Sequence, residues 1–130
     1  MNPVLVVVVL VGLIALATGL GVLWRGSQGR VRIASGHIAD VELGGRATLL
    51  QLSTEVCAPC RATARVLDGL STDEIRHVEV DIADRPDLVS RFNVLQTPTT
   101  FILDRTGAVR ARIGGAVRRD LIIAELERVA

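Results

Sequence analysis

The 130-residue sequence has no lysine and no tyrosine, and its aromatic residues are limited to Trp24, Phe92 and Phe101. All 15 basic residues are arginine, and with 14 acidic residues they give a formal net charge of +1. A surface so close to neutrality does not predict binding to nucleic acid, which depends on a strong excess of positive charge. The scarcity of aromatic residues also means that any core is packed almost entirely by Val, Leu, Ile and Ala.

Sequence motifs for nucleotides and metals are missing as well. The glycine pairs Gly44-Gly45 and Gly114-Gly115 are typical of turns, since no Gly-x-Gly-x-x-Gly or P-loop pattern accompanies them. The separations of His37 and His77 from the two cysteines fit no compact zinc finger. We interpret His37 as a solvated loop residue and His77 as a residue at the edge of a strand, and we expect no bound metal or cofactor.

The only two cysteines are Cys57 and Cys60, and Ala58 and Pro59 stand between them. Side chains three residues apart share one face of a helix, so the two sulfurs can meet as a disulfide. The run 47–52 before the motif is typical of a short buried strand, and apolar residues recur with helical spacing after it. The motif therefore lies at a strand-to-helix junction, which favours dithiol–disulfide chemistry.

The start of a helix gives the two sulfurs different roles. Its free N–H groups and positive partial charge favour the thiolate form of Cys57, which makes Cys57 the attacking sulfur. Pro59 is compatible with this position, because the first helical turn has N–H groups without intrahelical partners. Cys60, one turn further in, is expected to be less exposed and to act as the resolving thiol that releases the substrate.

Further landmarks appear in the order typical of one large family. They are the strand before the motif, basic Arg61 after it, Pro86 at the start of a short helix, Thr97-Pro98, and Gly114 before the last helix. On these residues the chain resembles the thioredoxin superfamily from Ala47 to Ala130. The segment 99–103, which opens with two threonines after Pro98, is most similar to that of the membrane-tethered thioredoxin-like reductases.

The resemblance implies a set of substrate-binding residues around the cysteines. The family's cis-proline falls on Pro98, and Thr97 before it offers backbone groups to an extended substrate peptide. By the same resemblance, Gly114 is expected to line the surface near the cysteines. Residues within and just before the motif complete the substrate surface: Val56, Ala58 and Pro59.

Three positions depart from the family pattern. Val56 stands where most thioredoxins have a tryptophan, so substrate contact there must be aliphatic. Gln51 occupies the place of the family's buried aspartate, and an amide cannot exchange protons with Cys60 as a carboxylate does. We hypothesise that Glu79, half-buried in the strand 76–81, takes over this proton relay. The alternative is that Glu79 is solvated at the end of its strand.

The N-terminal segment 4–23 is an uncharged run of mostly Val and Leu, long enough at ~1.5 Å per residue to cross the hydrocarbon core of a bilayer. Trp24 and Arg25 follow it, as an interfacial aromatic and a charged stop. We expect a membrane anchor in which residues 4–24 contact lipid. The alternative, a signal peptide cleaved after Ala15-Leu16-Ala17, is weakened because residues 1–3 contain no basic residue.

The orientation of this anchor follows from the arginines beside it. Arg25, Arg30 and Arg32 flank its C-terminal end, whereas the N-terminal side has neither Lys nor Arg. The positive-inside rule then predicts a single-pass protein with its catalytic domain in the cytoplasm. An extracytoplasmic domain remains the alternative, because many tethered thioredoxin-like proteins face outward and a redox-active cysteine pair suits either side.

The predicted architecture is α/β: a pared-down thioredoxin fold, with a mixed central sheet and helices on both faces, preceded by one transmembrane helix. Residues 1–24 form the anchor, residues 25–45 a connector with a short strand near Val41–Leu43, and residues 46–130 the thioredoxin-like domain. Within that domain we expect strands at 47–52, 76–81, 99–103 and 109–113, and helices at 58–70, 86–92 and 118–129. The polar turn 104–107 predicts an antiparallel hairpin between the last two strands.

These observations predict a membrane-anchored thiol–disulfide oxidoreductase that reduces disulfides in partner proteins. Its electrons must come from another protein, either a thioredoxin-reductase-like flavoenzyme or a membrane thiol shuttle. Two alternatives stay open. The first is an extracytoplasmic oxidase or a specialised reductase for cytochrome maturation. The second is a non-catalytic docking module that uses Val56 and the Pro98 surface as a peptide groove.

Overall fold

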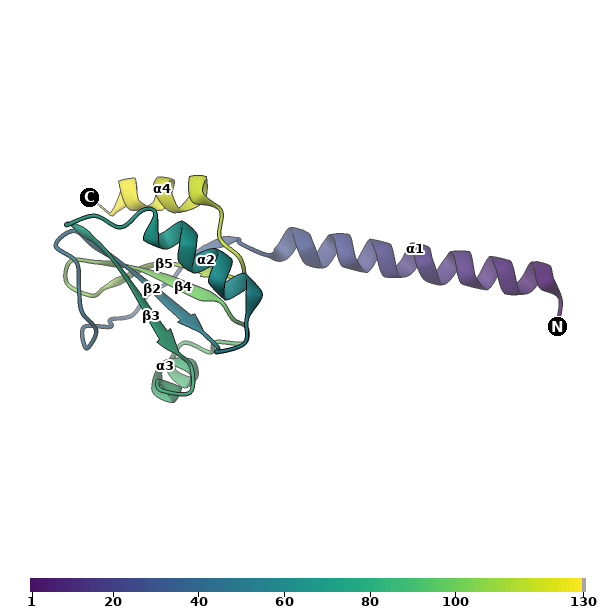
Figure 1. The fold of residues 1–130 in the computed structure, drawn as a ribbon, viewed down its shortest axis with the longest axis horizontal. Helices are drawn as coiled ribbons and strands as arrows, with labels where there is room; N and C mark the ends of the chain where they lie inside the picture. The colour runs from purple at the N-terminus through teal and green to yellow at the C-terminus, as the bar shows by residue number, and fades with distance from the viewer. Residues whose placement is uncertain (130) are drawn as a thin grey trace.

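The computed structural model describes residues 1–129 and consists of one long helix joined to a small α/β domain (Figure 1). The long helix, α1 (Pro3–Ser27), begins at Asn2, whose side chain accepts a hydrogen bond from the Val4 N–H at 3.1 Å. No residue of α1 is buried in the domain. Its length and composition suit a membrane span, and a signal sequence near an N-terminus can have the same length and composition.

The domain is built on one five-stranded sheet with the order β1-β5-β4-β2-β3. The strands are β1 (Val31–Ile33), β2 (Ala47–Ser53), β3 (Ile75–Asp81), β4 (Thr99–Asp104) and β5 (Val109–Gly114). Only β2 and β3 run parallel, and the other neighbouring pairs are antiparallel. The predicted mixed sheet and the hairpin of β4 and β5 are therefore confirmed.

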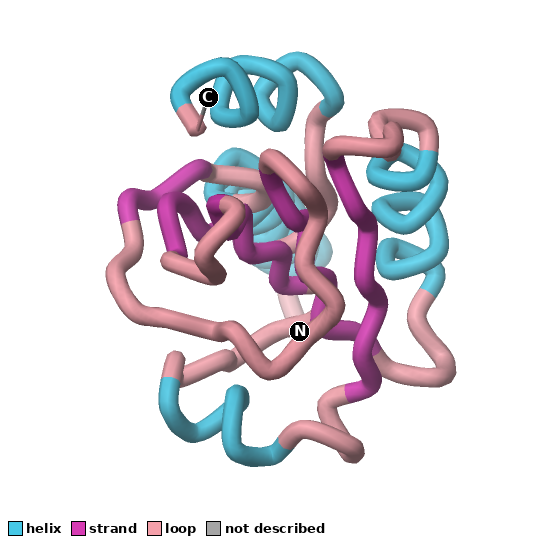
Figure 2. The backbone as a smooth tube through the Cα atoms, turned by 90° about the vertical axis from the view of Figure 1, so that its left-hand side faces the viewer, coloured by secondary structure: helices cyan, strands magenta, loops and turns pink. Residues whose placement is uncertain are grey.

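Helices cover both faces of this sheet. α2 (Ala58–Asp68) and α4 (Arg119–Arg128) lie on one side and α3 (Pro86–Arg91) lies on the other (Figures 1 and 2). Each side has its own apolar core: Leu67 and Ile122 pack with the first pair of helices, and Leu88 and Phe101 pack around α3. All seven residues of β2 are buried, because this strand is central and covered on both faces.

The connector contains a strand, but not where the sequence predicted one. Val41–Leu43 forms no strand, and its two apolar side chains are half-buried against the core around α3. The strand is instead Val31–Ile33, whose first residue lies opposite Ile113 on the edge of β5. The alternating Val-Glu-Leu pattern predicts burial of two side chains correctly, whereas the free edge of β5 decides which segment extends the sheet.

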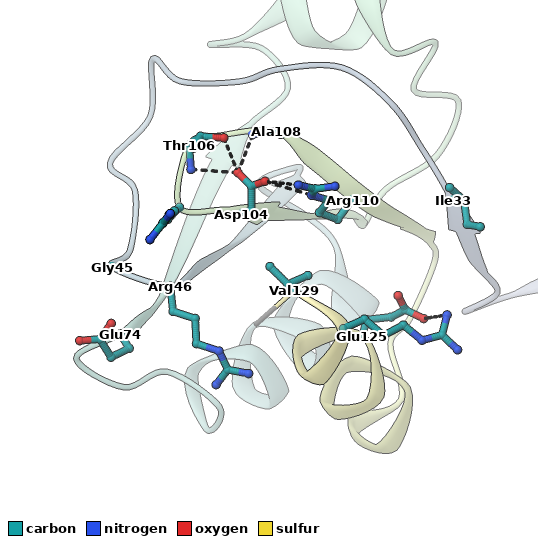
Figure 3. Close-up of a pocket in the computed structure, with 12 residues that line it drawn as sticks. Ile33, Gly45, Arg46, Glu74, Asp104, Thr106, Ala108, Arg110, Glu125 and Val129 are labelled. Atoms are coloured by element: carbon teal, nitrogen blue, oxygen red, sulfur yellow. Dashed lines mark hydrogen bonds and ion pairs between the residues drawn. The ribbon is translucent and has the colours of Figure 1, made fainter.

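Asp104 closes the turn between β4 and β5 (Figure 3). One of its oxygens accepts hydrogen bonds from the Thr106 hydroxyl at 2.6 Å, the Thr106 N–H at 2.9 Å and the Ala108 N–H at 3.1 Å. The other accepts from Arg110 Nε at 3.0 Å. The Thr106 hydroxyl above all, then the backbone N–H of Thr106 and the Arg110 guanidinium, hold the pKa of Asp104 well below its usual range.

We expect Asp104→Asn to lower the free energy of unfolding by about 1–3 kcal/mol at neutral pH, because it removes the charge that these donors share. The folded-state pKa of Asp104 lies below the unfolded one, so its stabilisation is lost as the pH falls below the usual carboxyl range. The difference between the two proteins should therefore shrink between about pH 4 and about pH 2 in urea unfolding followed by circular dichroism. Asp73→Asn, at an exposed position, is the control, and a difference independent of pH would contradict the assignment.

Candidate active site

Because of the strand register, three loops converge at one end of the sheet, the end at which β2 finishes, and we call this end the disulfide edge. Leu52 near the end of β2 lies opposite Thr99 at the start of β4, and Thr99 in turn lies opposite Gly114 at the end of β5. The loop after β2, which leads to Cys57, therefore shares this edge with Pro98 and with the turn after β5. The sheet thus brings together the segments that the sequence assigned to the substrate surface.

The cysteine pair occupies the start of α2 and is joined in a disulfide, with the two Cα atoms 5.2 Å apart. Cys57 is the N-cap, and its Sγ accepts a hydrogen bond from the Cys60 N–H at 3.2 Å. Cys57 is partly exposed, whereas Cys60 is only 1% exposed. This arrangement suits attack by Cys57, because a backbone N–H and the helix start stabilise negative charge on its sulfur.

Pro98 is preceded by a cis peptide bond to Thr97, as the resemblance implied. Its carbonyl accepts a hydrogen bond from the Gly115 N–H at 2.8 Å, which ties this loop to the turn after β5. The side chain of Gln96 lies against Gly114, where a Cβ atom would displace the amide end of Gln96. Gln96 was not singled out by the sequence, because a polar residue before a proline carries no spacing signal.

The loops at this edge also expose apolar side chains. Val56 is 92% exposed and Leu95 is 83% exposed. Ala58 and Pro59 are exposed as well. A small cavity of about 190 Å³ adjoins Leu95, and it is lined by Ile82, Val89, Val94, Leu95, Gln96 and Thr97. The edge of the sheet beside the disulfide therefore offers an aliphatic surface to an extended chain.

Gln51 lies directly behind the resolving cysteine. It is completely buried in β2, and its Nε2 donates a hydrogen bond to the carbonyl oxygen of Cys60 at 2.8 Å. The side chain therefore holds the first turn of α2 against the sheet. An amide in this position fixes the backbone of Cys60 but offers no acid–base group to its sulfur.

Glu79 differs from the sequence prediction. We expected it to be half-buried beside Cys60, but its side chain is exposed at the edge of the sheet and accepts a hydrogen bond from the Ser53 hydroxyl at 2.9 Å. Within residues 1–129 no hydrogen bond joins it to Cys60. The outermost position of β3 explains the exposure, since no further strand covers that side. The burial that the relay hypothesis invoked is missing.

His77 also differs from the prediction, because its side chain is more buried than expected. It lies on the edge strand β3 as expected, but its side chain is only 5% exposed. Its Nε2 lies 3.0 Å from Gln51 Oε1, and its Nδ1 lies 2.5 Å from Asp68 Oδ1 at the end of α2. Alternation along β3 was the available signal, because it places residue 77 on the same face as buried Ile75, which packs in the core beneath α2.

The large cavity of the domain lies away from this edge. It measures about 910 Å³ and opens beside Arg46, just before β2, and Asp104, where β4 ends (Figure 3). Because β2 and β4 are antiparallel, these positions mark the end of the sheet opposite the disulfide. The described residues contain no group of three or more His, Cys, Asp or Glu side chains that could hold a metal ion.

A disulfide at the N-cap of a helix, a cis-proline at the same edge of a mixed sheet and helices on both faces together define a thioredoxin-like redox domain. The family model described as Thioredoxin matches residues 36–128, and the chain belongs to the thioredoxin family. Members of this family use the redox-active disulfide itself, without a bound cofactor, and the sequence predicted none. Family membership and the Cys57–Cys60 pair support thiol–disulfide oxidoreductase chemistry.

Curated relatives agree with this assignment. Thioredoxin H2 of Arabidopsis thaliana is 26% identical over 65% of this chain and 65% of its own length, and thioredoxin H5 of Oryza sativa is 32% identical over 58% of each. The chain therefore spans less than two thirds of these two plant proteins. The thiol:disulfide interchange protein HelX of Rhodobacter capsulatus is 26% identical over 72% of this chain and 67% of its own.

Solved structures show the same fold. The malaria parasite thioredoxin-2 superposes with a TM-score of 0.60 and 22% identity, over 75% of this chain and 96% of its own. The Fasciola hepatica thioredoxin superposes with a TM-score of 0.55 and 21% identity, over 67% of this chain and 84% of its own. The predicted thioredoxin fold is thus confirmed.

We expect Glu79→Gln to change the rate of disulfide reduction by less than about twofold and to leave its pH profile in place, because an exposed carboxylate bonded to Ser53 does not serve Cys60. The measurement is the rate of insulin disulfide reduction across the neutral range. Glu55→Gln, at another exposed position near the motif, is the matched control. A shifted pH profile in Glu79→Gln alone would restore the relay hypothesis.

Proposed function

We propose that this protein is a membrane-anchored thiol–disulfide oxidoreductase that reduces disulfides in partner proteins. The observation that carries the proposal is the asymmetric cysteine pair, in which Cys57 is partly exposed at the helix start and Cys60 is buried behind it. A binding module has no physical need for either sulfur. The similarity to thioredoxins over most of the α/β domain supports the same chemistry.

The reaction proceeds by two exchanges between sulfurs. The Cys57 thiolate attacks one sulfur of a substrate disulfide, so a bond to Cys57 Sγ forms as the substrate S–S bond breaks, and one substrate thiolate leaves and is protonated by solvent. Cys60 then loses its proton and attacks Cys57 Sγ, which releases the second substrate thiolate. The substrate has gained two electrons, and the Cys57–Cys60 disulfide waits for two electrons from a dithiol donor protein.

The substrate lies as an extended segment along the edge described above. The backbone of Thr97 pairs with it beside Pro98, as in β-strand addition, and Gly114 leaves room for its chain. Val56, with exposed Ala58 and Pro59, contacts its apolar side chains. The absence of a large aromatic at Val56 favours recognition through the peptide backbone over insertion into a side-chain pocket.

The junction of the anchor with the domain supports action close to a membrane. After α1 ends, the Gly29 N–H donates to the Gly114 carbonyl at 2.8 Å, and Gln28 Nε2 lies 3.5 Å from Gln96 Oε1. The helix therefore joins the domain at the same edge as the disulfide (Figure 1). With α1 in a bilayer, the disulfide faces the membrane surface, so substrates and the electron donor are proteins with cysteines near that surface.

The side of the membrane follows from charge. Arg25, Arg30 and Arg32 lie on the domain side of α1, which favours a cytoplasmic domain and a thioredoxin-reductase-like flavoenzyme as the donor. A second candidate places the domain outside, as an oxidase or specialised reductase supplied by a membrane thiol shuttle. The similarity to HelX, a thiol:disulfide interchange protein, supports thiol–disulfide exchange in both candidates.

We expect Cys60→Ser to accumulate a mixed disulfide with a disulfide-containing peptide at least about tenfold above wild type, because the resolving attack is removed while Cys57 still reacts. Intact mass spectrometry of the 130-residue chain in detergent micelles measures the adduct. Cys57→Ser is the matched control and should form little adduct, since the remaining sulfur is buried. Equal trapping by both variants would contradict the assigned roles.

We expect the protein to stay in the membrane fraction after alkaline carbonate extraction, because an uncleaved α1 spans the bilayer. In intact cells a membrane-impermeant maleimide should label the reduced cysteines only after permeabilisation, as the positive-inside rule predicts. Labelling without permeabilisation would select the extracytoplasmic candidate. Release as a shortened soluble chain would instead identify residues 1–17 as a cleaved signal.

A further inference from the structure

A buried polar chain runs from the resolving cysteine to the surface. It begins at the Cys60 carbonyl, which accepts from Gln51 Nε2 at 2.8 Å, and continues from Gln51 Oε1 to His77 Nε2 at 3.0 Å. It ends where His77 Nδ1 meets Asp68 at 2.5 Å. Gln51 is 0% exposed and the His77 side chain 5% exposed, whereas the Asp68 side chain is 71% exposed. β2, β3 and the end of α2 each contribute one member.

The donors and acceptors of this chain fix the protonation of His77. The Cys60 carbonyl only accepts, so the amide nitrogen of Gln51 must face it and the amide oxygen must face His77. The amide oxygen also only accepts, so His77 Nε2 carries a proton. Asp68 Oδ1 lies 2.5 Å from His77 Nδ1, and a carboxylate oxygen only accepts, so His77 Nδ1 carries a proton too. His77 is therefore an imidazolium in this arrangement.

The charged and titratable groups near this ring come from α2, β3 and α4. From α2 the carboxylate in contact is Asp68, and from its own strand Glu79 lies two residues further on, bonded to Ser53. The β2 residue opposite it in register is apolar Leu49. On the same side of the sheet α2 carries the thiols of Cys57 and Cys60, and Arg119 of α4 reaches Gly69, the residue after Asp68. Burying the charge of His77 costs free energy that the exposed Asp68 carboxylate offsets only in part, so a charge held beneath the redox helix indicates a role other than stability.

We propose that His77 is a positioning residue for the redox pair: clamped by Asp68, it fixes Gln51 against the Cys60 carbonyl and places a positive charge behind the cysteines. This inference rests on the proposed thiol–disulfide function and names the group that tunes it. The charge favours the reduced pair, in which Cys57 is a thiolate and Cys60 a thiol. By thermodynamic reciprocity, reduction of the disulfide strengthens proton binding at His77.

The electron and proton balance gives the expected pH dependence. Reduction adds two electrons to the Cys57–Cys60 bond and one proton to Cys60, and it leaves a negative charge on Cys57. Where His77 titrates, the reduced protein also holds more protons on the ring than the oxidised one. The stabilisation of the dithiol by His77 is therefore present near neutrality and is lost once the ring is deprotonated in both redox states.

The first test observes the ring directly in the full 130-residue chain in detergent micelles. Nitrogen-15 NMR separates protonated from unprotonated ring nitrogens, and His37, exposed in a loop, is the one other histidine and serves as an internal reference. We expect both ring nitrogens of His77 to be protonated at neutral pH, and its titration midpoint to move to higher pH on reduction. A neutral His77, or the same midpoint in both redox states, overturns the proposal.

The second test measures the equilibrium with a small dithiol, so it does not depend on a protein substrate. His77→Gln keeps a donor for the Gln51 oxygen but removes the charge. We expect it to lower the equilibrium constant for the reduced form by about three- to tenfold at about pH 7, and to match wild type at about pH 10. A constant ratio at all pH values would mean a purely structural role and would overturn the proposal.

Asp68→Asn gives the matched comparison. Without the carboxylate His77 loses its proton more easily, so the pH at which the His77 effect disappears should fall. Asp73→Asn, at an exposed position five residues further on, should leave that pH unchanged. An equal shift in both variants overturns the clamp. If the Cys60→Ser trap fails while these shifts are observed, the proposed reductase function fails and the linkage of His77 to the disulfide stands.

Discussion

The position of Cys57 between β2 and α2 is the constraint on which the site depends. β2 is central and buried along its whole length, so its end is fixed on both faces and the helix that follows starts at a defined place. Cys57 is therefore the N-cap of α2, and its Sγ accepts a hydrogen bond from the Cys60 N–H. The same helix turn buries Cys60. The end of β2 thus decides which sulfur is exposed and which is buried.

The register of the sheet extends this constraint to α1. β4 and β5 are antiparallel to their neighbours, so the cis-proline loop and Gly114 lie at the edge where β2 ends. β1 pairs with β5, and Gly29, which lies between α1 and β1, donates its N–H to the Gly114 carbonyl at this same end of the sheet. The place where α1 joins the domain is therefore linked to the place of the disulfide. The three-residue strand β1 fixes where α1 joins the sheet. Because β1 pairs with the free edge of β5, it determines which side of the domain lies next to α1.

The fold was largely predictable because its signals are local. Apart from β1, each strand and helix of the α/β domain has a local pattern in the sequence, and the Cys-x-x-Cys motif with Thr97-Pro98 identified the family. The short strand β1 was not predictable, since Val31–Ile33 has no alternation stronger than that of Val41–Leu43 and only the free edge of β5 distinguishes them. Alternation along β3 places His77 on the same face as Ile75, whereas the contacts of His77 and the exposure of Glu79 depend on which part of that face α2 covers, and the sequence does not show this.

Gln51 stands where the family has a buried acid. This changes the electrostatics of the site, although a hydrogen-bonding side chain still occupies the position. A carboxylate behind Cys60 would place negative charge beside a developing thiolate, whereas the amide is neutral and passes the hydrogen bond on to a cation. Burying that cation alone would be costly, and Asp68 offsets the cost from the end of the same helix that carries the cysteines. The two ends of α2 are thereby coupled: its first turn holds the disulfide, and its last turn holds the counter-ion of the charge beneath it.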